Sequence, residues 1–213
     1  MSKFTTQTLP FDGPIIITPN SVGEPRNYLT DINDTDELLP LLEMEEGEEF
    51  VVQSVETMPR GVLRGLHFNR KTPQGLLIGA TSGAILMVVV DLRPESKTFG
   101  ASHAIELSAE NQQMIYIPKF YAQGLLTLEP HTEVVINYTT ESTPNRESGI
   151  IWDDEILMID WKFDRYDIDS NRLNMTAKDK KLPSFRSYNQ HDLWPGRIIK
   201  RSYALKRLLN SKL

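Results

Sequence analysis

Histidine and arginine side chains near the middle of the chain are the first candidates for chemistry. His67 is one of four histidines, and it stands three residues after Arg64 in the string Arg-Gly-Leu-His. A neutral imidazole has an unperturbed pKa of about 6.5, so it can take and release protons near neutral pH. The guanidinium fork can bind phosphate oxygens through two parallel hydrogen bonds. A lone histidine is more often structural, so any role for His67 depends on the sequence around it.

Missing residue types exclude several kinds of site. The sequence contains no cysteine, which excludes disulfides, thiolate zinc sites and cysteine nucleophiles. His67 is followed by Phe68 and Asn69 rather than by a second histidine. Because one histidine cannot build a tight transition-metal site, no metal is expected.

Length and charge narrow the class of protein. A chain of 213 residues with 39% apolar and 24% charged residues predicts one compact domain with an appendage at most. Residues 184–213 hold seven lysines and arginines against one acid, Asp192, whereas residues 1–183 carry 16 basic and 28 acidic side chains. An acidic body argues against nucleic-acid binding, which usually leaves a basic face.

No segment predicts a membrane span or export. The longest apolar run, Ala84–Val90, is far shorter than the roughly 18–20 residues of a spanning helix and suits a buried strand. Residues Met1–Gly13 lack the charged-then-apolar order of a signal peptide. We therefore expect a cytoplasmic protein.

Short strand-like segments must position any site. Gly, Pro, Asn and Asp interrupt the apolar runs every 8–12 residues, which is typical of an all-β sandwich or barrel and leaves no room for crossover helices. The expected strands are 14–18, 50–55, 61–69, 75–80, 84–92, 101–107, 113–117, 124–128 and 133–138.

The chain end has a different pattern. After Pro195 and Gly196, Ile198, Leu205 and Leu209 fall on one helical face, with basic residues elsewhere. We expect residues 1–183 to form the domain and residues 184–213 to form a basic extension with a helical tail. The tail should pack on its own domain or on a dimer partner; the alternative is a helix lying on a membrane surface.

Four stretches occur in a characteristic order: 60–69 (RGVLRGLHFN), 90–100 (VDLRPESKTFG), 107–118 (with LSAEN and IP) and 149–161 (with GIIWDD and IDW). Over about Pro14 to Pro183 the chain closely resembles the dTDP-4-dehydrorhamnose 3,5-epimerase family. The resemblance implies an all-β double-stranded β-helix (a cupin jelly roll) with short peripheral helices, a homodimer, and no cofactor.

The resemblance also implies a reaction. A 4-keto group on a nucleotide-linked 6-deoxysugar makes the hydrogens on C3 and C5 acidic; a base removes one, and an acid returns a proton to the opposite face through an enolate. His67 would be the base, with Asp179 of the Lys178-Asp179 step holding its far ring nitrogen. Arg64 and Arg26 would bind the diphosphate of the nucleotide sugar.

The resemblance also suggests further substrate-binding residues, and the sequence departs from the family pattern at several positions. Asn69, Glu56 and Gln123 are expected to contact substrate, Gln123 standing where the family has a histidine. Leu76 aligns with the family lysine assigned to the keto oxygen, and Glu141 or Ser142 with its catalytic tyrosine. The residues proposed as a substitute acid are Glu141 (if burial raised its pKa), Tyr138 and Tyr121.

Three functions remain open from the sequence. The first is an epimerase of a nucleotide 4-keto-6-deoxysugar, at C3, C5 or both. The second is a related enolate-based step such as a ketoisomerase reaction. The third is a nucleotide-sugar-binding protein without catalysis, because positions 76, 123 and 141–142 all depart from the family.

Overall fold

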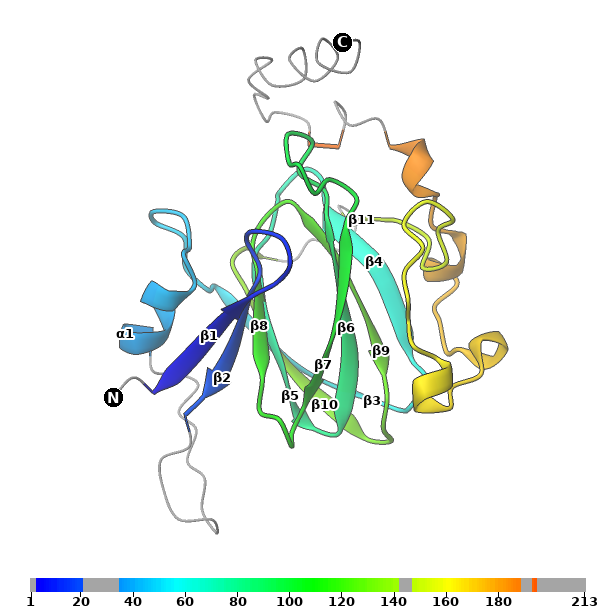
Figure 1. Cartoon of the computed structure of the whole chain (residues 1–213), viewed down its shortest axis with the longest axis horizontal. Coiled ribbons are helices and arrows are strands. Elements are labelled where there is room, and N and C mark those ends of the chain that lie inside the picture. Colours follow the sequence, from blue (N-terminus) through cyan, green and yellow to red (C-terminus); the bar gives the residue numbers. More distant parts are fainter. Residues whose placement is uncertain (1–2, 21–34, 142–146, 189–192, 195–213) are drawn as a thin grey trace.

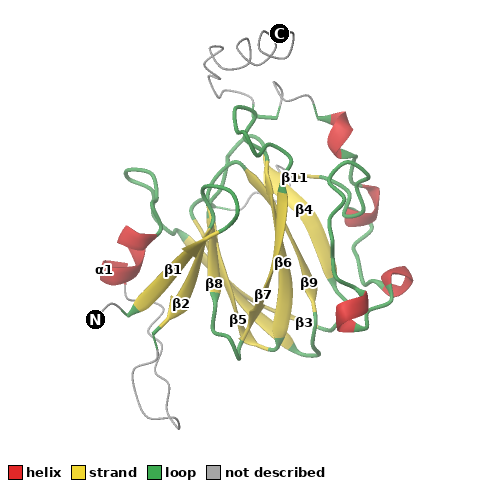
Figure 2. Cartoon of the chain, viewed as in Figure 1, coloured by secondary structure: helices red, strands yellow, loops and turns green. Residues whose placement is uncertain are grey.

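The computed structural model describes residues 3–20, 35–141, 147–188 and 193–194 (Figure 1). Strands dominate these residues, and the helical elements are single short turns at the periphery (Figure 2). The strands are β1 (Phe4–Thr8), β2 (Ile15–Pro19), β3 (Val52–Met58), β4 (Leu63–Asn69), β5 (Leu76–Ser82), β6 (Ala84–Asp91), β7 (Ser102–Ser108), β8 (Met114–Ile117), β9 (Tyr121–Thr127), β10 (Thr132–Tyr138) and β11 (Glu147–Gly149). The helical turns are α1 (Thr35–Leu38), η1 (Leu39–Leu41), η3 (Asp164–Tyr166), η4 (Ser170–Arg172), η5 (Asp179–Lys181) and η6 (Phe185–Ser187).

The strands form two sheets with antiparallel pairing throughout. The six-stranded sheet has the order β1-β2-β8-β5-β10-β3, and the five-stranded sheet has the order β11-β4-β9-β6-β7. The two sheets enclose an inner core to which β5, β6, β8, β9 and β10 contribute. The predicted all-β class is therefore confirmed at the level of two antiparallel sheets.

Strand β6 explains how one apolar run serves two cores. All eight of its residues are buried. Side chains of a strand alternate between faces, so Ile85, Met87 and Val89 enter the inner core, whereas Leu86 and Val88 face a second core. Residues from 150–188 and 193–194 cover that second core. Because β6 is covered on both faces, its sequence is a continuous apolar run rather than an alternating one.

Two residues within the expected basic extension contact the five-stranded sheet. Leu193 and Trp194 are 0% and 3% exposed and belong to the second core. The indole Nε1 of Trp194 donates to the carbonyl oxygen of Leu92, and its ring packs edge-on against Phe68 and Phe120. The predicted helical tail lies outside the described residues.

The string VDLRPESKTFG forms a polar network at the end of β6. Asp91 is fully buried, and its carboxylate accepts hydrogen bonds from the backbone and guanidinium of Arg93 and from the hydroxyls of Ser96 and Thr98. Burial alone raises the pKa of Asp91, but these donors outweigh it and lower that pKa. The guanidinium of Arg93 also lies over the ring of Tyr121. The string therefore ties a turn to β9 and to the inner core.

The strands predicted from the sequence are present, with ends shifted by a few residues. The largest shifts are at the start of β9, which begins at Tyr121 rather than at Gly124, and at the end of β3, which ends at Met58 rather than at Val55. Strands β1 and β11 were not predicted, because Phe4–Thr8 is a mainly polar edge strand and Glu147–Gly149 has only three residues. In the described part of the chain, no helix has the length and apolar character needed to cross a bilayer.

Candidate active site

Strand β4 directs Arg64 and His67 to the same side, although they are three positions apart. Side chains of a regular strand alternate, so residues separated by an odd number should point to opposite faces. The register between β4 and β9 shifts between Arg64 and His67. This irregularity puts both side chains in the space between the sheets, while Leu63 and Leu66 face the second core.

Glycines allow this irregularity where β4 passes β9. Gly65 has a φ of +100°, and a Cβ there would lie 2.8 Å from the carbonyl oxygen of Gln123 and 2.9 Å from Cα of Gly124. A Cβ on Gly124 would lie 2.8 Å from the carbonyl oxygen of Arg64. Because any other residue would collide at either position, the two glycines permit the close approach that fixes the directions of Arg64 and His67.

Asp179 reaches His67 from η5, far along the chain. Its Oδ1 lies 2.6 Å from Nε2 of His67, and its backbone N–H donates to Oγ1 of Thr176. The aspartate side chain is 2% exposed and the imidazole 24%. Burial raises the pKa of Asp179, but the hydrogen bond and charge of His67, with Thr176 and Lys178, outweigh burial and lower it. An ionised carboxylate accepts the Nε2 proton, which leaves Nδ1 with the lone pair.

Two adjoining cavities meet at His67. The outer cavity measures about 390 Å³ and has a mainly polar lining that includes Asp179. The inner cavity measures about 80 Å³ and reaches between the sheets. Arg64, His67, Gln123 and Tyr138 line both, so they stand where a polar compartment joins an apolar one. The apolar side chains of the inner cavity are Leu76, Ile78, Met87, Leu125 and Ile136.

Arg64 and Glu56 form an ion pair at the wall of the outer cavity. Nη1 of Arg64 donates to Oε2 of Glu56, which projects from β3. The two side chains are 39% and 29% exposed, and a solvated pair of this kind contributes at most about 1 kcal/mol. An anionic ligand can therefore displace Glu56 from Arg64 at small cost.

The other predicted substrate-binding residues also lie at the outer cavity. Asn69 lines it and accepts a hydrogen bond from the backbone N–H of Thr72. Gln123 lies directly opposite His67 in the β4–β9 register. Tyr138 reaches both cavities from β10. Arg26, the second predicted diphosphate ligand, lies outside the described residues.

Two of the three candidate acids lie elsewhere, which corrects the expectation from the sequence. The hydroxyl of Tyr121 donates to the carbonyl oxygen of Asp12, and its ring stacks on Phe11 within the inner core. Glu141 is exposed beyond the end of β10, so its carboxyl lacks the burial on which the expectation depended. Neither residue lines the two cavities at His67.

Sequence reasoning assigned no role in the site to three polar residues that line the outer cavity: Gln74, Thr176 and Lys178. Gln74 lines it and donates to the carbonyl oxygen of Thr140. Thr176 lines it and holds the backbone of Asp179. The only signal for Thr176 was its position three residues before Asp179, which suits a hydroxyl that accepts from a turn N–H. Gln74 follows Pro73 in a loop, where no alternation indicates the direction of a side chain.

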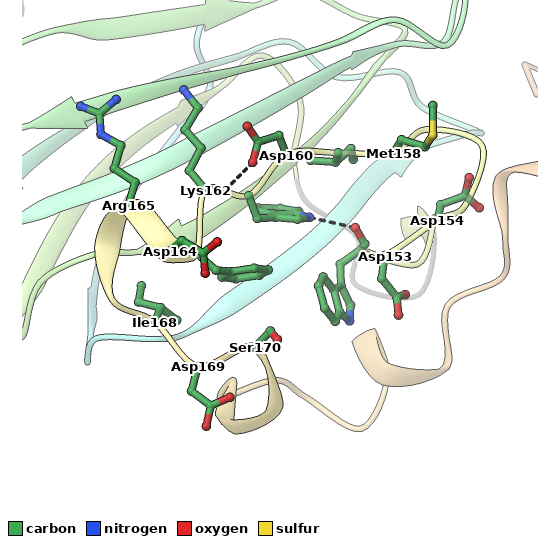
Figure 3. Close-up of a pocket in the computed structure, with 14 residues that line it drawn as sticks. Asp153, Asp154, Met158, Asp160, Lys162, Asp164, Arg165, Ile168, Asp169 and Ser170 are labelled. Atoms are coloured by element: carbon green, nitrogen blue, oxygen red, sulfur yellow. Dashed lines mark hydrogen bonds between the residues drawn. The ribbon is translucent and has the colours of Figure 1, made fainter.

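A larger cavity, of about 860 Å³, lies along residues 152–170 and does not include His67 (Figure 3). Its carboxylates mostly hold the local backbone: Asp154 accepts from Ile156 and Leu157, and Asp160 accepts from Lys162. Nε1 of Trp161 donates to the carbonyl oxygen of Trp152 in the wall of this cavity. These contacts stabilise an irregular segment. The residues that line this cavity include no histidine that a carboxylate could orient as a base.

Across residues 3–20, 35–141, 147–188 and 193–194, no group of three or more histidine, aspartate or glutamate side chains is placed to hold a metal ion. His67, oriented by the Asp179 carboxylate, can carry out proton transfer, and Arg64 beside it can bind an anion.

Comparison with known sequences identifies a family whose model matches most of the chain. A family model described as dTDP-4-dehydrorhamnose 3,5-epimerase matches residues 8–187. The dTDP-4-dehydrorhamnose 3,5-epimerase of Methanothermobacter thermautotrophicus is 39% identical over 191 residues, which cover 87% of this chain and 97% of that protein.

Solved structures agree with the fold. A crystal structure of dTDP-6-deoxy-D-glucose-3,5-epimerase from Legionella pneumophila, in complex with dTDP-4-keto-L-rhamnose, has a TM-score of 0.81 at 26% identity and covers 91% of this chain and 99% of that one. The dTDP-4-dehydrorhamnose 3,5-epimerase of Bacillus anthracis, with TDP and PPi bound, has a TM-score of 0.75 at 31% identity, covering 85% and 99%.

Proposed function

This chain belongs to the dTDP-4-dehydrorhamnose 3,5-epimerase family, and from that premise we propose that it inverts a nucleotide-linked 4-keto-6-deoxysugar at C3, C5 or both. The enzyme is an isomerase of deoxysugar biosynthesis that works by removing and returning a proton through an enolate. The observation that carries this proposal is the buried Asp179 carboxylate, 2.6 Å from Nε2 of His67, at a cavity that Arg64 also lines.

His67 is the base in this proposal. Asp179 accepts the Nε2 proton and leaves Nδ1 to take the hydrogen from the carbon beside the ketone. When the imidazolium forms, the ionised carboxylate stabilises it, and the low exposure of Asp179 strengthens that interaction. The electron pair of the broken C–H bond moves into the enolate, whose oxygen carries the negative charge.

Arg64 binds the diphosphate of the substrate. Glu56 holds only Nη1 of the guanidinium, so the ligand replaces a partly solvated carboxylate with a doubly charged group that accepts a bidentate pair of hydrogen bonds. Gln123 and Asn69 line the same cavity and are placed to contact the sugar. The solved relative from Bacillus anthracis holds TDP and PPi, which supports a nucleotide diphosphate as the ligand class.

Deuterium exchange tests the proposal. The protein is incubated in D₂O with dTDP-4-keto-6-deoxyglucose, and deuterium at C3 and C5 and the configuration of each carbon are followed by NMR and mass spectrometry. We expect uptake with inversion, and His67→Ala should abolish both, whereas His131→Ala, at an exposed histidine, should keep wild-type rates.

The same experiment separates the alternatives. A 3,4-keto shift without inversion identifies a ketoisomerase. Absence of exchange with thymidine, uridine, guanosine and cytidine nucleotides, together with measurable binding of a nucleotide sugar, identifies a binding protein. Either result contradicts the proposed epimerase.

We further propose that the two sheets form a double-stranded β-helix and that the chain is a homodimer. Val51, which immediately precedes β3, and Val55 on β3 are 49% and 58% exposed. Val55 pairs across the strands with Val135 on β10. Val135 lines an outer-face cavity of about 250 Å³ with Leu77. An exposed apolar sheet face of this kind suits a second copy of the chain.

Light scattering measures the oligomeric state. We expect a dimer for the wild type and a monomer for Val55→Glu, because a carboxylate in an apolar interface is left unpaired. Ile156→Glu, at a residue that is 46% exposed on another surface, should stay dimeric. A monomeric wild type contradicts the homodimer.

A further inference from the structure

We propose that the cavity of about 860 Å³ along residues 152–170 binds the basic end of the same chain, residues 195–213. This surface is separate from the proposed epimerase site, because its lining does not include His67. Trp161, in the cavity wall, belongs to the second core, which strand β6 separates from the inner core. The docked segment therefore lies on the outer side of the five-stranded sheet.

Apolar side chains are exposed at this cavity. Met158 lines it and is 79% exposed, and Ile156, two residues earlier, is 46% exposed. Trp152 and Phe163 also line it, and their rings pack edge-on while remaining only partly buried. Single exposed apolar side chains are normal, but a group of them around a cavity indicates a surface that a partner covers.

Carboxylates surround these apolar side chains. The lining includes five aspartates but only two basic residues, Lys162 and Arg165. Nη2 of Arg165 lies 3.8 Å from Oε2 of Glu106, which offsets its charge. Figure 3 shows both basic side chains extending toward the neighbouring strands, away from Asp153 and Asp169. The cavity therefore attracts a cationic partner and repels an anion such as a nucleotide sugar.

The chain end has the opposite charge and apolar residues of its own. Residues 195–213 contain six lysines and arginines and no acidic residue. Ile198, Leu205 and Leu209 recur at the spacing of one helical face. A segment of this composition complements a cavity that combines exposed apolar side chains with carboxylates, because apolar burial gives affinity and opposite charges fix the orientation.

Trp194 tethers this segment to the face that carries the cavity. It is 3% exposed and packs in the second core together with Trp161. The 19 residues that follow it reach about 60 Å when extended. That length exceeds the diameter of roughly 45 Å for a domain of 213 residues, so the cavity lies within reach. Because the tether gives an effective concentration near the millimolar range, weak contacts are enough to hold the segment in place.

Carbodiimide cross-linking of the full-length chain tests the proposal. The reagent joins a lysine to a carboxylate only where the two are in contact, and the lysines of the segment are Lys200, Lys206 and Lys212. We expect mass spectrometry to find them joined to aspartates within residues 152–170. Mixing isotopically labelled with unlabelled chains distinguishes links within one chain from links between two copies, since the latter combine a labelled and an unlabelled peptide.

Two substitutions with the same change of charge provide the variant and its control. Asp164 and Glu110 are both exposed, and neither side chain has a hydrogen-bond or ion-pair partner among the described residues. Of the two, Asp164 alone lines the cavity. Asp164→Lys puts a like charge against the segment, so the yield of links to the other aspartates should fall by about tenfold or more. Glu110→Lys should keep the wild-type yield, and circular dichroism should give unchanged spectra for both variants.

Each result bears on the proposal. Links within one chain that Asp164→Lys reduces and Glu110→Lys leaves unchanged support docking in the cavity. Links to carboxylates elsewhere, or no links, overturn it. Links between labelled and unlabelled chains place the segment on a second copy, and absence of links together with binding to vesicles of phosphatidylcholine and phosphatidylserine places it on a membrane surface; both results overturn docking on its own chain. None of these measurements uses epimerase activity, so failure of the proposed function and failure of this proposal are distinguishable.

Discussion

Oδ1 of Asp179 lies 2.6 Å from Nε2 of His67, across 112 positions of sequence. The contact joins a strand of the five-stranded sheet to a short turn that Thr176 holds by its hydroxyl. Because the pKa of Asp179 is lowered, the carboxylate is ionised throughout the neutral range and can stabilise a charged imidazole.

Replacing Asp179 by asparagine should slow proton exchange without unfolding the protein. The amide keeps the size of the side chain but can present an N–H to Nε2, which would select the wrong tautomer of His67. We expect the exchange rate in D₂O to fall by about 10² or more. Circular dichroism should give an unchanged spectrum, and Asp153→Asn, at an exposed aspartate, should keep the wild-type rate. Exchange at the wild-type rate in Asp179→Asn would remove the carboxylate from the mechanism.

The sequence can predict the parts of the site that lie within one short motif, but not the contacts between distant parts of the chain. The RGLH string singled out Arg64 and His67, and the structure shows how they come together: Gly65 allows the register shift that turns both side chains to one side. The late Lys178-Asp179 step could be assigned to His67 only through the family resemblance, since no local pattern links a strand to a turn so far along the chain.

Contacts between residues of different strands could not be predicted from the sequence, because the sequence does not give the register or the packing of the strands. Glu56 and Arg64 meet through tertiary packing of β3 and β4, which lie in different sheets, and strand alternation alone predicts no such pair. Tyr121 and Tyr138 were equivalent candidates in the sequence. Their positions in the folded chain distinguish them. The hydroxyl of Tyr121 donates to the carbonyl oxygen of Asp12 in the inner core, whereas Tyr138 lines both cavities.

Replacing Gly65 by alanine should destabilise the fold and misplace the site. The substitution adds the strain of a positive φ and a collision with the backbone of Gln123 and Gly124, together roughly 2–4 kcal/mol. Gly61→Ala is a matched control, because its φ of +79° is also positive but nothing lies within 4 Å of the added Cβ. Urea unfolding should show a clearly larger loss for Gly65→Ala, with weaker TDP binding as well. Equal losses in the two variants would mean that the close approach of β4 and β9 contributes nothing.

Arg64 and Glu56 should have opposite effects on ligand affinity. Arg64→Ala removes the guanidinium that binds the diphosphate, so we expect TDP affinity, measured by calorimetry, to fall by at least about tenfold. Glu56→Gln removes the carboxylate that competes for Nη1, so TDP should bind severalfold more tightly while the free energy of unfolding changes by less than about 1 kcal/mol. Weaker binding by Glu56→Gln would show instead that Glu56 orients Arg64 for the ligand.

The buried carboxylate of Asp91 makes stability depend on pH in a direction that can be worked out. Its pKa is lowered in the folded protein from the usual 3.8, since burial is outweighed by Arg93, Ser96 and Thr98. A group with a lowered folded pKa contributes stability that is fully present above its unfolded pKa and is lost as the pH falls through the folded pKa. Asp91→Asn should therefore cost roughly 3 kcal/mol at pH 7, because it leaves the guanidinium of Arg93 without its counter-ion. In urea unfolding measured at several pH values, the gap between wild type and Asp91→Asn should narrow below about pH 4, whereas the exposed control Asp153→Asn should follow the wild type throughout. A gap that stays constant down to the acid transition would mean that Asp91 acts through shape and packing rather than through its charge.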